Sequence, residues 1–253
     1  MSQAGTAPTR RRTWPVLLGG GMLLVILLAL GTWQVQRLQW KEGLLAQINE
    51  RVHSDPVDLA AIEEIYASSG DIEYRPVAVE GTFLHVGERH YLATWNGQSG
   101  FNVYTPLHLA DGRWLFVNRG FVPYERKDPA TRIEGQIEGP VAITGLVRTA
   151  PEEKPSFVVP DNDPVKNVFY WKDLDAMAAS SGLPKDATVL PFFVDAGDAP
   201  NPGGLPVGGV TRIDLPNNHL QYAVTWYGLA AVLCAFLFLW SRRNRRGKES
   251  DAP

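Results

Sequence analysis

Apolar residues are concentrated in two long stretches, one near each end of the chain. Residues 13–36 and 215–241 contain no Asp, Glu, Lys or Arg. Their apolar cores, residues 16–32 and 223–240, are close to the roughly 20 residues that a helix needs to cross about 30 Å of hydrocarbon. The pattern predicts one transmembrane helix at each end.

Basic residues lie on the terminal side of both stretches. Residues 10–12 are three arginines, and residues 242–248 contain four arginines and a lysine. Positive charge in short flanking segments stays in the cytoplasm, so both tails are expected there. We therefore predict a cytoplasmic tail over 1–13, membrane helices over 14–36 and 222–240, a periplasmic domain over 37–221 and a basic cytoplasmic tail over 241–253. The alternative is a secretory signal peptide over 10–31, with a weak cleavage site at residues 29–31.

Between the two stretches the pattern changes from helical spacing to alternation. Apolar residues at helical spacing predict that the first membrane helix continues to Val52 as an amphipathic stem. A second helix is expected over 56–69, with Asp55 as N-cap and Gly70 as its stop. Short β-rich runs follow, and Asp111-Gly112 is a hairpin signal. Strands are predicted over 76–84, 89–95, 102–109, 113–118, 140–148, 167–171 and 188–195, with a short helix within 171–180.

The expected fold class is therefore membrane-anchored α+β. Two transmembrane helices, N-terminal and C-terminal, flank a β-rich antiparallel barrel or sandwich that lies outside the cytoplasm. Residues 151–164 and 199–209 are dense in proline and glycine and are predicted loops.

The charge balance separates the tails from the middle of the chain. The chain has 24 Lys and Arg and 27 Asp and Glu, and the tails hold eight basic and two acidic residues. The remaining 16 basic and 25 acidic residues give the middle a net charge near −9, which excludes the basic patch that nucleic acid requires. Cys234, the single cysteine, lies in the second membrane stretch. No disulfide framework or paired-thiolate metal site is expected.

The sequence contains only weak signals of catalytic residues. The segment 97–100 lacks the full nucleophile-elbow pattern, and the glycine-rich segment 203–209 lacks the lysine and hydroxyl of a phosphate loop. His85 and His90 flank an expected hairpin and are interpreted as surface or strand decoration. We predict no catalytic residues and a protein that is not an enzyme.

Aromatic and basic residues share one face of the predicted stem. Trp33, Arg37, Trp40 and Lys41 follow helical spacing just outside the apolar stretch. One interpretation is a charged clamp for the carboxylates of an amphiphilic ligand. The other is an ordinary anchor whose cations meet lipid headgroups.

The second membrane helix is expected to begin with a histidine. Asn218 is the predicted N-cap, with Gln221 in the reciprocal position of a capping box. His219 then lies in the first turn, where the helix dipole disfavours an imidazolium and a neutral ring can ligate iron. Tyr222 and Trp226 follow at i+3 and i+7 on the same face. The alternative is a capping or interfacial histidine.

Several blocks together resemble the surfeit locus protein 1 family. They occur in family order over nearly the whole chain, and Phe121 is one departure, where many members carry Trp. The blocks are GTWQVQRLQWK at 31–41, YRPV at 74–77, GTF at 81–83, VNRGFVP at 117–123, GLVR at 145–148 and NHLQYAVTWY at 218–227.

The resemblance implies an assembly factor for haem–copper terminal oxidases, chiefly cytochrome c oxidase, that acts when haem a enters the catalytic subunit. It also implies that His219 matches a histidine associated with haem a, as ligand to the haem iron. The family's arginine block maps to Arg119, and its stem block to Trp33, Arg37 and Trp40.

From these observations we expect His219, Arg37, Trp40, Tyr222 and Trp226 to contact transiently bound haem a. The expected partners are cytochrome c oxidase subunit I or other assembly factors, together with membrane lipid. About a dozen residues precede the first apolar stretch, which favours a bacterial cytoplasmic membrane over a mitochondrial one. The alternative function is a scaffold that stabilises an oxidase subunit and binds no haem.

Overall fold

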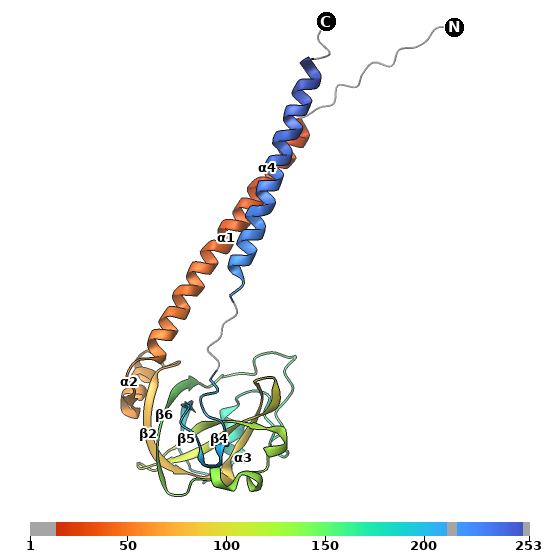
Figure 1. The fold of residues 1–253 in the computed structure, drawn as a ribbon. Coiled ribbons are helices and arrows are strands. Elements are labelled where there is room, and N and C mark those ends of the chain that lie inside the picture. Colours follow the sequence, from red (N-terminus) through yellow and green to blue (C-terminus); the bar gives the residue numbers. More distant parts are fainter. Residues whose placement is uncertain (1–13, 212–216, 250–253) are drawn as a thin grey trace, which may run out of the picture. The chain divides into compact units, whose positions relative to one another are not determined.

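Two units make up the chain, and each is described by itself. The computed structural model describes residues 14–211 and 217–249. A two-helix unit comprises the residues up to Ala46 and those from Asp214 onward, and a β-rich unit extends from Gln47 to Ile213 (Figure 1). Arg10, Arg11 and Arg12, on which part of the predicted topology depends, lie outside the described residues.

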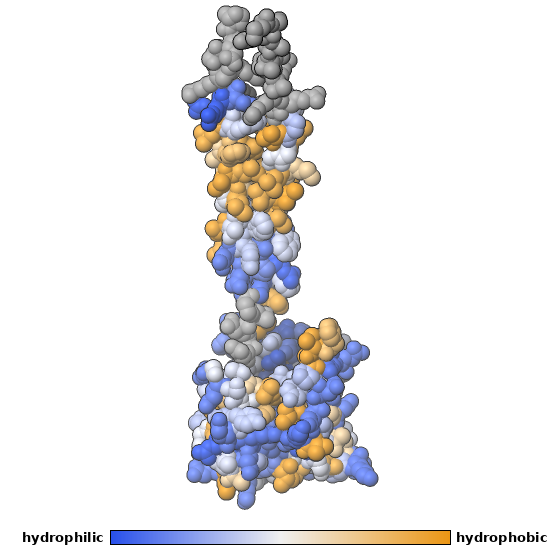
Figure 2. Space-filling model, turned by 90° about the vertical axis from the view of Figure 1, so that its right-hand side faces the viewer, coloured by the Kyte–Doolittle hydropathy of each residue, from blue (hydrophilic) through white to orange (hydrophobic). Residues whose placement is uncertain are grey.

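The two-helix unit contains the apolar stretches at both ends of the chain. Helix α1 runs from Trp14 to Val52 without a break, so the expected stem and membrane helix are one helix. Helix α4 spans His219–Glu249. Both helices are long and apolar enough to cross a membrane. On the face that Figure 2 shows, an apolar band crosses the paired helices, with hydrophilic surface on either side of it. The prediction of two flanking candidate membrane helices is confirmed.

Small residues bring α1 and α4 together as an antiparallel pair. A Cβ atom on Gly20 would meet the Leu237 side chain, and one on Gly31 would meet the ring of Tyr227. Leu27 on α1 and Ala223 and Ala230 on α4 are buried along the same seam. Close approach through small residues is the usual way for helices to associate in a membrane, where there is no hydrophobic drive between them.

The β-rich unit is a closed barrel with added edge strands. Its seven strands are hydrogen-bonded in the order β1-β2-β6-β7-β5-β4-β3, and β2 also pairs with β4, which closes five of them into a barrel. The pairing of β5 with β7 is parallel, and the other barrel pairings are antiparallel. The strands are β1 Val57–Asp58, β2 Pro76–Phe83, β3 Arg89–Trp95, β4 Gln98–Leu109, β5 Trp114–Pro123, β6 Pro140–Thr149 and β7 Val189–Ala196.

Apolar side chains pack on both faces of the central strands. The barrel interior is mainly aliphatic and includes Val117, Val147 and Val194. An aromatic cluster on the other face joins Tyr104, Phe116, Phe169 and Phe193 with Met177 of α3. Because both faces are covered, β5 and β7 are buried almost continuously rather than at alternate positions. Adjacent residues of β7 therefore pack in different clusters, Phe193 in the aromatic cluster and Val194 in the barrel interior.

Short helices cover the ends and one side of the barrel. Helix α2, Leu59–Ser69, inserts Ile62 into the interior cluster, and α3 spans Leu174–Ser180. The predicted stop at Gly70 is confirmed, because Gly70 adopts φ 70° as the C-cap. Among the described residues of this unit, the remaining helices are of the 3₁₀ type: η1 His85–Gly87, η2 Tyr124–Arg126, η3 Pro129–Gly135 and η4 Pro202–Gly204.

Two local predictions are wrong. The N-cap of α2 is Asp58, whose carboxylate accepts a 2.8 Å hydrogen bond from the Ala61 amide, and not Asp55. The segment 167–171 forms isolated bridges through Val168 and Phe169 instead of a strand. Asn167 has a positive φ of 51°, which interrupts an extended run.

A fragment of residues 47–213 is expected to unfold in one cooperative thermal transition. Its buried clusters are built from its own residues, and Cys234 lies outside it. A domain of this size with its own core normally behaves as a two-state unit. Far-UV circular dichroism during heating checks this. A broad, non-cooperative melt would show that the helices complete the core.

Candidate functional site

The first residue of α4 makes a side-chain contact with α1. The Nδ1 atom of His219 lies 2.7 Å from Oε1 of Gln34. Gln34 is buried on α1, and His219 is half-buried. An amide oxygen only accepts, so Nδ1 carries a proton and donates it, and in the neutral ring the lone pair is then on Nε2. The ring is thereby held in one tautomer and one orientation.

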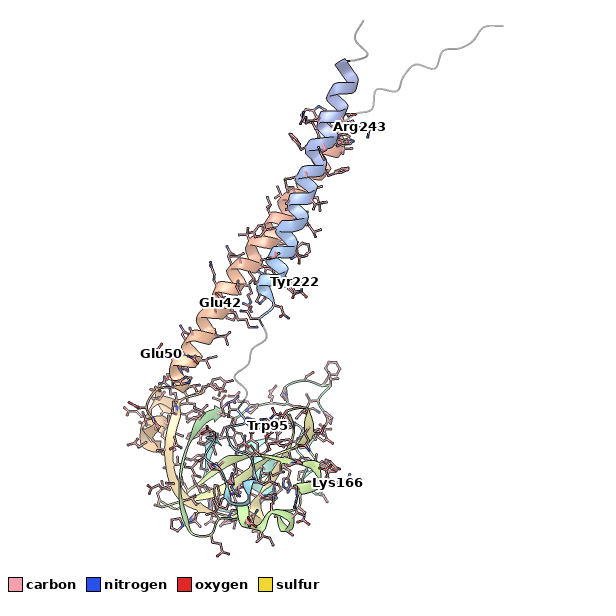
Figure 3. The ribbon with its side chains drawn as sticks, viewed as in Figure 1. Glu42, Glu50, Trp95, Lys166, Tyr222 and Arg243 are labelled. Atoms are coloured by element: carbon pink, nitrogen blue, oxygen red, sulfur yellow. The ribbon has the colours of Figure 1, made fainter. Side chains whose placement is uncertain are left out.

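The local sequence explains why the histidine is at a helix start. The carbonyl oxygen of Asn218 accepts a 3.2 Å bond from the Tyr222 amide, as the carbonyl of an N-cap residue does. Helix α4 then begins at His219. Its next inward positions are Ala223 and Trp226, while Tyr222 is 54% exposed beside the seam. Figure 3 shows Tyr222 near the start of α4.

The predicted stem residues form a separate feature of α1. The guanidinium carbon of Arg37 lies 3.9 Å from the centre of the Trp40 ring, which is a cation–π contact. Trp33 and Trp40 are each 54% exposed, and Lys41 is half-buried. In the described part of the chain, no hydrogen bond or ring contact joins Arg37, Trp40, Tyr222 or Trp226 to His219. Gln34, which sequence reasoning missed, is the residue that the structure brings to the histidine.

The arginine of the VNRGFVP block is buried in the barrel unit. Arg119 is 2% exposed, lies 4.7 Å from the Phe83 ring centre and donates to the carbonyl of Gly135 and, over 3.2 Å, to the Asn201 side chain. It has no acidic partner among the described residues, and burial lowers the pKa of its guanidinium to about 10. Its bonds attach η3 and the loop near Asn201 to β5, which is a structural role.

The adjacent glycine serves the same purpose. Gly120 adopts φ 119°, and a Cβ there would collide with the carbonyl of Val207. Phe121 and Val207 exchange backbone hydrogen bonds of 2.9 and 2.8 Å. Glycine at this position therefore lets the returning segment pair with β5.

A buried charged group in the barrel was missed from the sequence. Glu88, His90 and Arg132 are each at most 5% exposed. Arg132 binds both carboxylate oxygens of Glu88, and His90 Nε2 lies 2.9 Å from one of them. Burial raises the pKa of Glu88, but the bonds from His90 and Arg132 outweigh it and hold that pKa below its ordinary value. Of the two alternatives for His90, a surface position is wrong, because the side chain is buried, and a strand position is confirmed, because His90 lies in β3.

These arrangements differ in the ligand that each could hold. Within the described residues, no group of three histidine, cysteine, aspartate or glutamate side chains could hold a bare metal ion. A single imidazole whose second nitrogen is already hydrogen-bonded is the usual form of a protein ligand to haem, since the macrocycle supplies four nitrogens itself. His219 with Gln34 fits that form, whereas His90, bonded within a buried ion pair, does not.

Comparison with known proteins identifies the family of the chain. The model of the SURF1 family matches residues 21–231. Surfeit locus protein 1 of Homo sapiens is 40% identical over 92% of this chain and 78% of its own length. The Gallus gallus protein of the same name is 40% identical over 88% and 74%, and a SURF1-like protein of Monosiga brevicollis is 38% identical over 93% and 94%. The chain therefore belongs to the SURF1 family.

Proposed function

We propose that this protein assists the assembly of cytochrome c oxidase by receiving haem a at His219 before the haem enters the catalytic subunit. Membership of the SURF1 family supports the role in oxidase assembly. The observation that carries the haem proposal is the 2.7 Å contact between His219 Nδ1 and Gln34 Oε1, which leaves Nε2 available for iron.

The surrounding residues support each part of this role. Gln34 orients the imidazole, and Trp226 and Tyr222 supply aromatic surface on the same side of α4. Arg37, which makes a cation–π contact with Trp40, is the arginine of α1 that is nearest in sequence to Gln34. It is the candidate partner for a haem propionate. Haem a would contribute the iron and the macrocycle, and these residues would bind and orient it.

The cellular setting belongs to the same proposal. Two membrane helices with basic tails favour a bacterial cytoplasmic membrane, with both termini in the cytoplasm and the barrel in the periplasm. The client would be subunit I, reached directly or through other assembly factors. The protein would carry and position its cargo without acting as an enzyme.

Replacing His219 with alanine is expected to abolish or shift the Soret band of protein purified from cells that make haem a. The imidazole is the proposed iron ligand, so its loss leaves no nitrogen at that position. Visible absorption per mole of protein is the measurement, with membrane insertion and abundance determined in parallel.

The matched control is Asn218→Ala, which is expected to cost about 1 kcal/mol of helix stability and to keep the ligand. Haem loss in His219→Ala but not in Asn218→Ala supports ligation. An unchanged spectrum in His219→Ala removes this residue from the site. Normal oxidase maturation without any bound haem would favour the scaffold function instead.

A further inference from the structure

A cavity of about 340 Å³ opens into the barrel unit. Side chains from five strands line it, together with Lys172 and the segment that follows η4. This volume is at the small end of ligand sites in proteins. Lining side chains that matter here are Tyr91, Trp95, Tyr104, Arg148, Lys172 and Asp195.

The acidic residue of the cavity is already neutralised. Asp195 lies 3.3 Å from Arg148 Nη1 and also accepts bonds of 2.9 Å from both Asn118 and Thr211. Arg148 in turn binds Glu73 through Nε at 2.8 Å. Arg148 is therefore held between two carboxylates, and the balance of this group is not positive.

Lys172 has no direct partner of this kind, and Asp195 and Glu73 act on it only at a distance. No ion pair or hydrogen bond involves its ammonium group in the described ranges, and it lies 5.6 Å from the ring centre of Tyr104 and 5.9 Å from that of Phe193. Cation–π contacts of this length leave the three N–H donors unused. A buried cation that makes no hydrogen bond within its cavity favours the binding of an anionic ligand there.

Tyr104 provides a second unused donor in the same cavity. Its side chain is fully buried, and its hydroxyl has no hydrogen-bond partner among the described residues. Buried hydroxyl groups are nearly always paired, so this hydroxyl on the cavity wall is a donor that a ligand oxygen could use. Burial raises the pKa of Tyr104 well above its ordinary value, which keeps the hydroxyl protonated and able to donate.

We propose that this cavity binds a small organic monocarboxylate, with one oxygen on the ammonium of Lys172, the other accepting from the hydroxyl of Tyr104, and a planar apolar body against Tyr91 and Trp95. A single cation without a direct ion-pair partner matches a single negative charge. The carboxylate of Asp195 in the same wall disfavours a phosphate dianion. The proposal does not depend on haem binding.

Binding is expected to weaken as the pH rises. Burial is the main cause that lowers the pKa of Lys172, and Arg148 lowers it further, while Asp195 and Glu73 raise it. Tyr104 and Tyr91 complete the titratable groups around the cavity. The anion binds the protonated amine, so affinity is retained below the pKa of Lys172 and is lost above it.

The test uses the full-length protein in detergent, with benzoate as the probe and neutral benzamide as its isostere. Benzoate is expected to raise the melting temperature of the barrel unit and benzamide is not. Lys172→Met should abolish the benzoate shift, and Tyr104→Phe should weaken benzoate binding about tenfold, since a hydrogen bond to a charged group is lost. The matched control is Lys166→Met at a surface lysine, which Figure 3 shows away from Trp95. It should leave the shift intact.

A second measurement covers the case in which Lys172→Met fails to fold. In the unsubstituted protein, benzoate should protect Lys172 from an amine-reactive reagent, while Lys166 is labelled equally with and without it, as read by peptide mass spectrometry. Equal effects of benzoate and benzamide, or no protection of Lys172, overturn the proposal. Tighter binding of inorganic phosphate than of benzoate overturns the assignment to carboxylates.

Discussion

Replacing Arg132 with methionine is expected to lower the free energy of unfolding of the barrel unit by about 3–5 kcal/mol at pH 7. Arg132 and Glu88 form an ion pair in which both side chains are at most 3% exposed. Removal of the guanidinium leaves the Glu88 carboxylate buried, with His90 as its remaining partner. The cost arises from that uncompensated charge, and denaturant unfolding of the solubilised protein measures it.

Two further variants separate charge from packing. Arg113→Met removes an arginine whose pair with Glu63 is about one-third exposed, so about 1 kcal/mol or less should be lost. Adding Glu88→Gln to Arg132→Met should restore part of the stability, because the buried charge is then absent. A loss in Arg132→Met no larger than that in Arg113→Met would contradict the expectation.

The same pair gives a pH dependence with a defined sign. The pKa of Glu88 is lowered in the folded protein, so its contribution is present above its unfolded pKa of about 4.3 and is lost as the pH falls through its folded pKa. The difference between the unsubstituted protein and Arg132→Met should therefore shrink in acid.

Replacing Gln34 with leucine is expected to weaken haem binding about 10- to 100-fold, if His219 is the ligand as proposed. The substitution removes the acceptor that holds Nδ1–H of His219, so the ring loses its fixed orientation and its iron-binding nitrogen becomes less basic. Haem titration followed by absorbance measures the affinity. Gln36→Leu is the matched control, because the same change is made at an exposed position of the same helix.

The outcome distinguishes orientation from general damage to the helix pair. Gln34→Glu keeps an acceptor for Nδ1–H and should retain haem, whereas Gln34→Leu should not. Equal affinity in Gln34→Leu and Gln36→Leu would mean that the hydrogen bond has no part in binding.

Periodicity was sufficient to predict most strands, and tertiary pairing explains the exceptions. Strand β3 has the predicted bounds, because the β-rich run that predicts it lies entirely within the strand itself. The start of α2 moved from Asp55 to Asp58 because Val57 pairs with Val77 of β2, which draws the intervening residues into an extended bridge. Neither aspartate could be preferred from the local sequence, since both are suitable caps.

Site prediction had a similar limit. A histidine at a helix start was recognisable from Asn218 and the apolar run that follows it. Its partner Gln34 lies 185 positions away, and Arg132 lies 44 positions from Glu88. Such contacts depend on how helices and strands pair, which residue spacing within one segment does not encode. Lys172 was missed for the same reason, since its cavity is assembled from several strands.

The polar contact between α1 and α4 also determines how the two helices are aligned along their length. Small and apolar residues form most of the described seam, and such surfaces tolerate sliding; a second polar contact, 3.1 Å between the hydroxyls of Thr32 and Tyr227, also joins the two helices. A slide of one turn, about 5.4 Å, would separate Gln34 from His219 and leave both facing apolar side chains. Even one polar pair in an apolar helix interface can select one register, and the contact between Thr32 and Tyr227 favours the same alignment. The first and last helices of the chain are therefore a matched pair, and neither can be exchanged for a generic membrane anchor without loss of that alignment.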